Sequence, residues 1–221
     1  PGSISLLITG DEEGPAINGT TKVLDWMSNN NEVIDACIVG EPTNPDYLGQ
    51  MIKIGRRGSF TGWLTVTGVQ GHTAYPHLAE NPLSKLVKML EPLAEEQLDQ
   101  GTEYFPPTTA AISSIDTGNS ASNVIPQKVT ASFNIRFNDS RTAEDIEKWL
   151  RAHFDSVGGN YTLETACSSN AFITEPGALS DDLVSAVKAV VGTQPAMSTT
   201  GGTSDARFIR KFCPVIEFGV V

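Results

Sequence analysis

Apolar and polar positions follow a buried-sheet pattern in the first sixty residues. Residues 6–8 and 33–39 are rich in apolar side chains and predict buried strands, and 51–57 predicts a third. Helical spacing of apolar residues predicts a helix over 20–27, between the first two strands. Each of the first two strands is followed by a glycine and a glutamate. Strands that alternate with a helix in this way indicate an α/β sheet.

A different pattern begins near residue 58. Residues 59–68 alternate between apolar and polar positions, which predicts a half-buried strand. Residues 82–98 predict an amphipathic helix that Pro92 should kink or shorten. Further strands at 108–115, 129–137 and 161–166, with a helix at 142–154, complete the order β-α-β-β-α-β. This order is typical of a ferredoxin-like split βαβ module, which we place at residues 58–170.

The α/β pattern resumes after this module. The spacing predicts helices at 180–191 and 206–211, separated by a polar loop that contains two glycines, and then a strand over 215–221. We therefore predict an α/β domain formed by residues 1–57 and 171–221. An α+β domain, residues 58–170, is inserted into it.

The composition limits the classes of partner. The chain has 221 residues and a net charge of −11, which argues against nucleic acid or an anionic membrane as the main partner. No apolar run approaches the roughly 20 residues that a transmembrane helix needs. The three cysteines are far apart and odd in number, which fits a reducing cytoplasm. Because the chain begins and ends on predicted strands, we expect a fragment of a longer protein.

Acidic residues follow both of the first two predicted strands. Glu12 and Glu13 come after the first strand and Glu41 after the second. In open α/β sheets, ligands bind outside the carboxyl ends of parallel strands, so these three side chains are expected to converge there. One carboxylate can then bind a metal while another acts on a water molecule. The alternative is a solvated acidic loop, where the acids favour the dipole of the following helix.

Cationic and polar residues offer further candidate contacts. His72 stands in a loop that follows a strand. A histidine side chain in general titrates near neutral pH and can bind zinc or stabilise an oxyanion, although loop histidines are often surface residues. Arg56, Arg57 and Arg136 suit a substrate carboxylate, because the guanidinium group forms bidentate contacts. For each of them alone, a salt bridge to one of the 26 acids is favoured. Asn123 is either a turn residue or a polar substrate contact.

Six short motifs occur in an order that resembles the M20 metallopeptidases. They are LITGDEEG at 7–14, VGEPT at 39–43, GRRGS at 55–59, GHTAYP at 71–76, NVIP at 123–126 and TGGTSD at 200–205. Any one of them is weak evidence, but six in order with consistent spacing are strong evidence. The similarity extends through the whole chain.

The resemblance implies a role for individual residues. Glu12 matches the general base, Glu13 a ligand of one zinc ion and Glu41 a ligand of the other. His72 matches the histidine that reaches across a dimer to the partner's active site, where it stabilises the oxyanion. Residues 58–170 match the dimerisation, or lid, domain, which implies a homodimer. Seven residues match positions that hold the acyl group or the substrate backbone: Arg56, Ser59, Tyr75, Asn123, Arg136, Gly202 and Thr203.

The implied activity is amide hydrolysis with two zinc ions, or cobalt, per complete site. The implied substrate is N-succinyl-LL-2,6-diaminopimelate, from which succinate is removed in lysine biosynthesis. Other M20 deacylases, such as acetylornithine deacetylase or a carboxypeptidase, remain alternatives, as does a non-catalytic dimerisation module. An acetyl group would not need arginines such as Arg56 and Arg136.

The sequence also departs from the family pattern. The family has an H-x-D histidine ligand and a bridging aspartate before the strand predicted at 6–8, and a last histidine ligand beyond residue 221. None of these three has a counterpart here. Because Glu13 and Glu41 alone cannot form a tight binuclear zinc site, we expect this chain by itself to bind zinc weakly and to hydrolyse no substrate.

Overall fold

The structure is a computed structural model that describes residues 2–95 and 97–221. It divides into two compact units, one formed by Pro1–Arg56 and Phe172–Val221, the other by Arg57–Ala171. We call them the split unit and the inserted unit, and describe each by itself. Within the described residues, no helix combines the length and the apolar character needed to cross a membrane.

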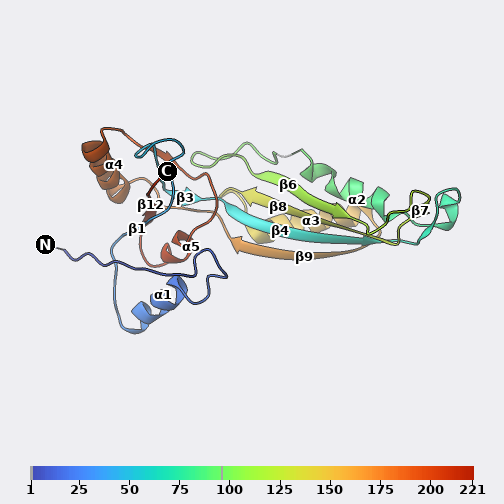
Figure 1. Ribbon diagram of the computed structural model, residues 1–221, viewed down its shortest axis with the longest axis horizontal. Coiled ribbons are helices and arrows are strands. Elements are labelled where there is room, and N and C mark those ends of the chain that lie inside the picture. Colours follow the sequence, from blue (N-terminus) through green and yellow to red (C-terminus); the bar gives the residue numbers. More distant parts are fainter. Residues whose placement is uncertain (1, 96) are drawn as a thin grey trace. The chain divides into compact units, whose positions relative to one another are not determined.

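The inserted unit is built on a four-stranded antiparallel sheet with the order β6-β8-β4-β9 (Figure 1). The strands are β4 (Gly58–Thr67), β6 (Thr109–Asp116), β8 (Lys128–Phe137) and β9 (Asn160–Ser169). Alternate residues of β8, from Val129 to Phe137, are buried, as the period of a half-buried strand requires. A short β5 (Gly71–His72) pairs with β7 (Val124–Ile125) in a separate two-stranded sheet.

Two helices pack against the sheet of the inserted unit. Helix α2 (Pro82–Leu90) contacts β4, β8 and helix α3 (Ala143–Val157). Their apolar faces join the same core cluster, which includes Leu86, Met89, Ile146, Leu150 and Phe154. The predicted β-α-β-β-α-β order is therefore confirmed. Pro92 shortens the first helix as expected, because a 3₁₀ turn, η2 (Glu91–Leu93), follows directly; residue 96 lies outside the described residues. A second 3₁₀ turn, η1, spans Pro76–Leu78.

The split unit contains a mixed four-stranded sheet with the order β1-β12-β2-β11. The strands are β1 (Cys37–Val39), β2 (Met51–Lys53), β11 (Ala196–Ser198) and β12 (Val215–Glu217). Strand β1 runs parallel to β12, and β2 parallel to β11, while β12 and β2 are antiparallel. A short β3 (Gly55–Arg56) pairs with β10 (Phe172–Ile173).

Helices contribute to two core clusters of the split unit. Val215 of β12 packs in a cluster with residues of α1 (Thr20–Asn29) and α5 (Ala206–Ile209). The next residue, Ile216, packs in a second cluster with residues of α4 (Ala178–Val191). Successive side chains of a strand point to opposite faces, so β12 is buried on both sides, as expected for an α/β sheet.

Several predictions for the split unit were wrong or too long. The predicted strand at 6–8 is irregular, and Leu6 and Ile8 are largely exposed, because no described segment pairs with it. The strand predicted at 33–39 is reduced to Cys37–Val39, since only these residues pair with β12. The strand predicted at 51–57 is divided into β2 and β3, and the strand predicted at 215–221 ends at Glu217. Strands β5, β7, β10 and β11 were not predicted.

Candidate functional site

The acidic turn at residues 11–14 is organised by Asp11. Its Oδ2 atom accepts hydrogen bonds from the backbone amides of Ile17 at 2.6 Å and Asn18 at 2.8 Å. Its carbonyl oxygen accepts from the amide of Gly14 at 3.3 Å. Asp11 therefore has a structural role, and it leaves the neighbouring Glu12 and Glu13 side chains to other contacts.

Glu12 lies among other acidic groups. Burial raises its pKa, and the negative charges of Glu13 and Asp205, together with a hydrogen bond to Glu13, act in the same direction, while Arg207 opposes them. Asp205 accepts a hydrogen bond from Thr20 Oγ1 at 2.6 Å through Oδ2, but its buried Oδ1 atom has no partner among the described residues. Glu12 is therefore protonated more easily than a glutamate in water.

Glu41 belongs to the same acidic group. Burial raises its pKa to about 7, with further contributions from Glu217, Glu12 and Glu13, while Arg56 lowers it. The three acids that we expected to converge thus interact with one another electrostatically within the split unit. Such carboxylates repel each other unless a proton or a cation is shared between them.

Strands β1 and β12 position Glu41. Their parallel register pairs Val39 with Glu217, and the amide of Phe218 donates to the carbonyl of Val39 at 3.0 Å. Gly219 then passes so close to the backbone of Glu41 that a Cβ atom would lie 2.3 Å from its carbonyl oxygen. Only glycine fits at this close approach, which fixes the backbone from which the Glu41 side chain projects.

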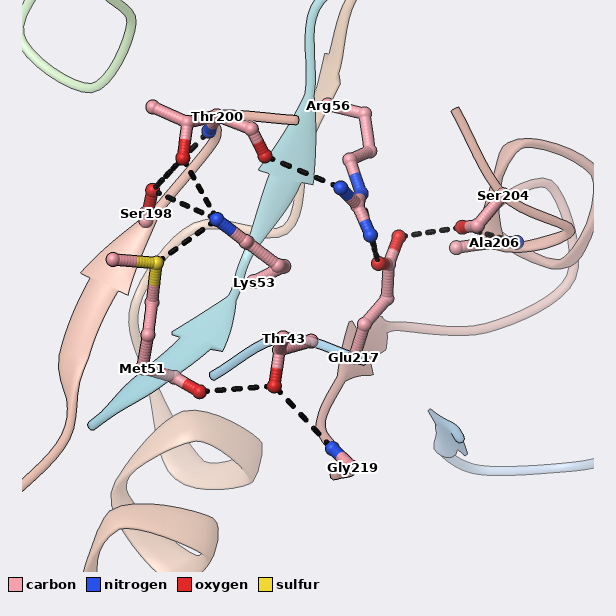
Figure 2. A network of polar contacts seen from close by, with 10 residues as sticks. All are labelled: Thr43, Met51, Lys53, Arg56, Ser198, Thr200, Ser204, Ala206, Glu217 and Gly219. Carbon is pink, nitrogen blue, oxygen red and sulfur yellow. Dashed lines mark hydrogen bonds and ion pairs between the residues drawn. The ribbon is translucent and has the colours of Figure 1, made fainter. Parts of the chain in front are cut away.

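Arg56 forms a buried ion pair with Glu217 (Figure 2). Its Nε and Nη2 atoms donate to Glu217 Oε2, and its Nη1 atom donates to the carbonyl of Thr200 at 3.2 Å. Gly201 has a φ of +101°, and a Cβ there would lie 2.4 Å from Arg56 Nη1. The salt bridge that the sequence left open as an alternative is thus present. It adjoins residues 200–205, which we call the glycine loop.

Lys53, at the end of β2, holds the other side of this loop. Its Nζ atom donates to Thr200 Oγ1 at 2.7 Å and lies 3.4 Å from Ser198 Oγ, as Figure 2 shows. Burial lowers its pKa to about 8, helped by the positive charge of Arg56, while Glu217 opposes the shift. Neither Lys53 nor Glu217 was predicted from the sequence. Their signal was a single charged residue inside an apolar strand, where a charge is seldom buried without a partner.

The remaining residues of the glycine loop face different surroundings. Gly202 is exposed, with no atom within 4 Å of the position of a Cβ. Thr203 has a buried hydroxyl group without a partner among the described residues. Ser204 Oγ donates to Glu217 Oε1 at 2.6 Å. The loop is therefore anchored at Thr200 and Ser204. Between them, Gly202 adjoins open space, and the hydroxyl group of Thr203 has no partner among the described residues.

Ser59 and Arg136 are cross-strand neighbours in the inserted unit. They pair directly in the register of β4 and β8. Arg57, next to them in sequence, donates to Thr109 Oγ1 at 3.2 Å, and its pKa is lowered by burial and by the positive charge of Arg136. The structure thus places Arg57, Ser59 and Arg136 close together, near the start of β4.

His72, Tyr75 and Asn123 form a second group in the inserted unit. His72 Nδ1 accepts from the amide of Ala74 at 3.0 Å, so Nε2 is the nitrogen that is left to carry a proton. Nε2 lies 3.5 Å from Asn123 Nδ2, and the ring centroids of His72 and Tyr75 are 6.0 Å apart. All three side chains are exposed.

The two groups of the inserted unit are far apart. Ser59 stands near the start of β4, whereas His72 follows its end. A ten-residue strand at about 3.3 Å per residue is roughly 30 Å long, so one small substrate cannot touch both groups of the same chain.

The acids of the split unit fit a divalent cation in part. Glu12, Glu13 and Glu41 offer oxygen ligands. A bound cation would relieve the repulsion between their negative charges, which contributes to the raised pKa values of Glu12 and Glu41. Among the described residues, however, no three His, Cys, Asp or Glu side chains already have the arrangement of a metal site. The chemistry of the donors therefore fits two or three carboxylate ligands of a larger set.

The sequence is similar to characterised proteins along its whole length. Residues 54–162 match the peptidase dimerisation domain of the M20 peptidases. The chain is 62% identical over 220 residues to succinyl-diaminopimelate desuccinylase of Rhodospirillum centenum, covering 100% of this chain and 57% of that protein. It is 53% identical over 222 residues to the protein of the same name from Gluconacetobacter diazotrophicus, with the same two coverages. The chain thus spans a little over half the length of these relatives.

Solved structures support the same assignment at the level of the fold. An M20 family metallo-carboxypeptidase from Sulfolobus solfataricus has a TM-score of 0.67 at 16% identity, covering 89% of this chain and 58% of that chain. A dipeptidase from Saccharomyces cerevisiae has a TM-score of 0.64 at 17% identity, with coverages of 93% and 57%. Residues 54–162 thus match the M20 peptidase dimerisation domain, and the whole chain is similar in sequence to succinyl-diaminopimelate desuccinylases and in fold to M20 peptidases.

Proposed function

We propose that the chain is part of a zinc-dependent amide hydrolase that removes succinate from N-succinyl-LL-2,6-diaminopimelate. The observation that carries this proposal is 62% identity, over the whole chain, to a protein named for that reaction. The acidic group of Glu12, Glu13 and Glu41 gives it a chemical basis.

Glu12 acts as the proton shuttle in this proposal. It takes a proton from the attacking water and delivers it to the leaving amine, which requires a carboxyl group that both accepts and releases a proton near neutral pH. The raised pKa of Glu12, caused by burial and by the nearby acids, suits that role better than the ordinary value does.

Glu13 and Glu41 are the proposed metal ligands of this chain. Bound zinc supplies Lewis-acid polarisation of the amide carbonyl and a more acidic water. The carboxylate of Glu41, held by β1 and β12, would be kept ionised by the cation, against the present tendency of burial to protonate it.

Each unit, taken by itself, carries proposed substrate contacts. Arg56, Gly202 and Thr203 belong to the split unit, and Ser59 and Arg136 lie side by side in the inserted unit. A succinyl group ends in a carboxylate, for which arginine and backbone amides are suitable partners.

His72, Tyr75 and Asn123 are proposed to act on the active site of a second copy, in a homodimer formed through residues 58–170. The separation of about 30 Å between this group and Ser59, along β4, is consistent with two groups that serve different sites. The match of residues 54–162 to a peptidase dimerisation domain supports the same proposal. A cytoplasmic location is proposed from the three free cysteines alone.

Kinetics of the full-length enzyme with zinc and the N-succinyl substrate test the proposal. Glu12→Gln should lower kcat by about 10² to 10⁴, the usual contribution of a general base. Glu32→Gln, at an exposed glutamate after α1, is the matched control and should leave kcat unchanged. No turnover of the substrate by the wild type, or equal kcat for both variants, would contradict the proposal.

The nature of the acyl group is tested by Arg136→Ala. If the arginine binds the succinyl carboxylate, this variant should lose at least about tenfold in kcat/KM, the size of one charge-assisted hydrogen bond. An enzyme that removes acetyl groups has no carboxylate at this point, and Arg136→Ala should then spare activity. N-Acetylornithine as the competing substrate separates the two cases.

A further inference from the structure

Glu217 holds three donors from two distant parts of the split unit. Its Oε2 atom accepts from Nε and Nη2 of Arg56, which is 161 residues away in sequence, and its Oε1 atom accepts from Ser204 Oγ at 2.6 Å. The residue is 1% exposed. Both carboxylate oxygens are therefore occupied and shielded, so Glu217 itself has no atom with which to contact a substrate.

The partners of Glu217 secure the two ends of the glycine loop (Figure 2). At one end, Arg56 Nη1 donates to the carbonyl of Thr200, and Gly201 packs against the same nitrogen. At the other end, Ser204 Oγ also accepts from the amide of Ala206 at 3.3 Å, at the start of α5. One carboxylate thus determines the direction of the Arg56 guanidinium and the position of both loop ends.

We propose that Glu217 is a positioning residue for substrate recognition, acting through Arg56 and through the loop that carries Gly202 and Thr203. The proposal rests on the function proposed above, in which Arg56, Gly202 and Thr203 bind the substrate. Two N–H groups of the Arg56 guanidinium donate to the one oxygen Oε2, which fixes the plane of the group, so its remaining N–H groups keep a defined direction. Groups that bind a ligand need such support to stay within a fraction of an ångström of their working geometry.

Kinetics of the full-length enzyme test the positioning role. Glu217→Gln keeps the shape but removes the charge that aligns Arg56, and should raise KM for the N-succinyl substrate about ten- to one-hundred-fold. Because Glu217 touches no reacting atom, kcat should stay within about threefold. Ser204→Ala removes one of the bonds and should raise KM about three- to tenfold, which keeps the proposal testable if Glu217→Gln does not fold.

Thr174→Val is the matched control for hydrogen bonds lost near β12. Thr174 Oγ1 donates to the carbonyl of Val215 at 2.6 Å and accepts from its amide at 3.2 Å, but it contacts neither Arg56 nor the loop. This variant should lower thermal stability and leave KM unchanged. An equal rise in KM for Thr174→Val and Glu217→Gln would overturn the proposal, because any structural loss would then have the same effect.

A double-mutant cycle shows whether Glu217 acts through Arg56. In an Arg56→Ala background, Glu217→Gln should raise KM by no more than the about three- to tenfold expected of Ser204→Ala, since Arg56, the larger of the two groups through which it acts, is already absent. A full, additive rise in KM in that background would overturn the proposal.

Hydrogen exchange gives a readout that does not depend on turnover. Amides at residues 200–205 should exchange faster in Glu217→Gln and Ser204→Ala than in the wild type, and at the wild-type rate in Thr174→Val. Unchanged exchange in both loop variants would overturn the positioning role. If the variants show this exchange pattern but the wild type does not turn over the N-succinyl substrate, the proposed function fails while the anchoring of the loop by Glu217 stands.

Discussion

Gly62→Ala should destabilise the inserted unit by steric conflict with Phe133. The two residues are opposite each other in β4 and β8, and an added Cβ would lie 2.3 Å from Phe133 Cζ and 2.6 Å from Cε2. The ring is fully buried in the core of the unit, so it has no free volume into which to turn. Overpacking of this kind costs about 1–3 kcal/mol, against which alanine regains about 0.5–1 kcal/mol relative to glycine in a strand. The expected net loss is about 1–2 kcal/mol.

Urea unfolding of the 221-residue chain measures this loss, with fluorescence of Trp149, which packs against the same core, as the probe. Phe133→Leu shortens the ring side chain and should relieve the conflict. The double variant should then be about 1 kcal/mol more stable than the sum of the two single changes predicts. Gly58→Ala, whose Cβ would lie 2.2 Å from Phe137 Cζ, should behave like Gly62→Ala. Unchanged stability of Gly62→Ala, or strict additivity in the double variant, would refute the reasoning.

Three further expectations concern single contacts. Thr142→Ala removes the capping box at the start of α3, where Thr142 and Asp145 exchange hydrogen bonds, and should cost about 1 kcal/mol in thermal unfolding. Burial raises the pKa of Asp99, but hydrogen bonds from Thr108 and Gly101 outweigh it and hold the pKa below its ordinary value, so this group stabilises the fold above its unfolded pKa. That stability is lost as the pH falls from the unfolded pKa, about 3.9, through the lower folded pKa, and Asp99→Asn should flatten acid unfolding curves in this range. The folded pKa of Lys53 is lowered to about 8, whereas its unfolded pKa is about 10.4. The stability of the wild type should therefore rise with pH between these two values. Urea unfolding at about pH 7 and 9.5 should show this rise in the wild type and not in Lys53→Met.

The inserted unit was the more predictable part of the fold. Its strands are long enough for alternation to show, and β8, predicted at 129–137, spans Lys128–Phe137. One face of the sheet is covered by its own helices, so burial and sequence period agree. The split unit has strands of two or three residues, for which an apolar run says little about length. Residues 6–8 form an apolar run but no strand. A strand needs a neighbouring backbone with which to form hydrogen bonds, and the pattern of apolar residues does not show whether one is present.

The candidate site was partly predictable for a related reason. Glu12, Glu13 and Glu41 could be found because glycine and glutamate follow apolar segments, a local signal in the sequence. Lys53 and Glu217 could not be recognised as parts of the site from such a local signal. Lys53 binds Thr200, which is 147 residues away, and Glu217 binds Arg56, which is 161 residues away. A pattern that treats buried positions as apolar has no place for a buried charge whose partner is distant. Arg56 was selected for its chemistry, but its ion pair was visible only in the structure.

The division of one unit into two chain segments has a consequence for the order of folding. Arg57–Ala171 is continuous, so all its strands leave the ribosome before β12 does. Strands β1 and β2 must wait for β12 to join them, because β12 lies between them in the sheet. Since synthesis proceeds from the N-terminus and domains fold as units, we expect the inserted unit to be formed while the first segment is still incomplete. During that interval, the guanidinium group of Arg56 must be solvated by water, and the acidic group can close only after β12 has been synthesised.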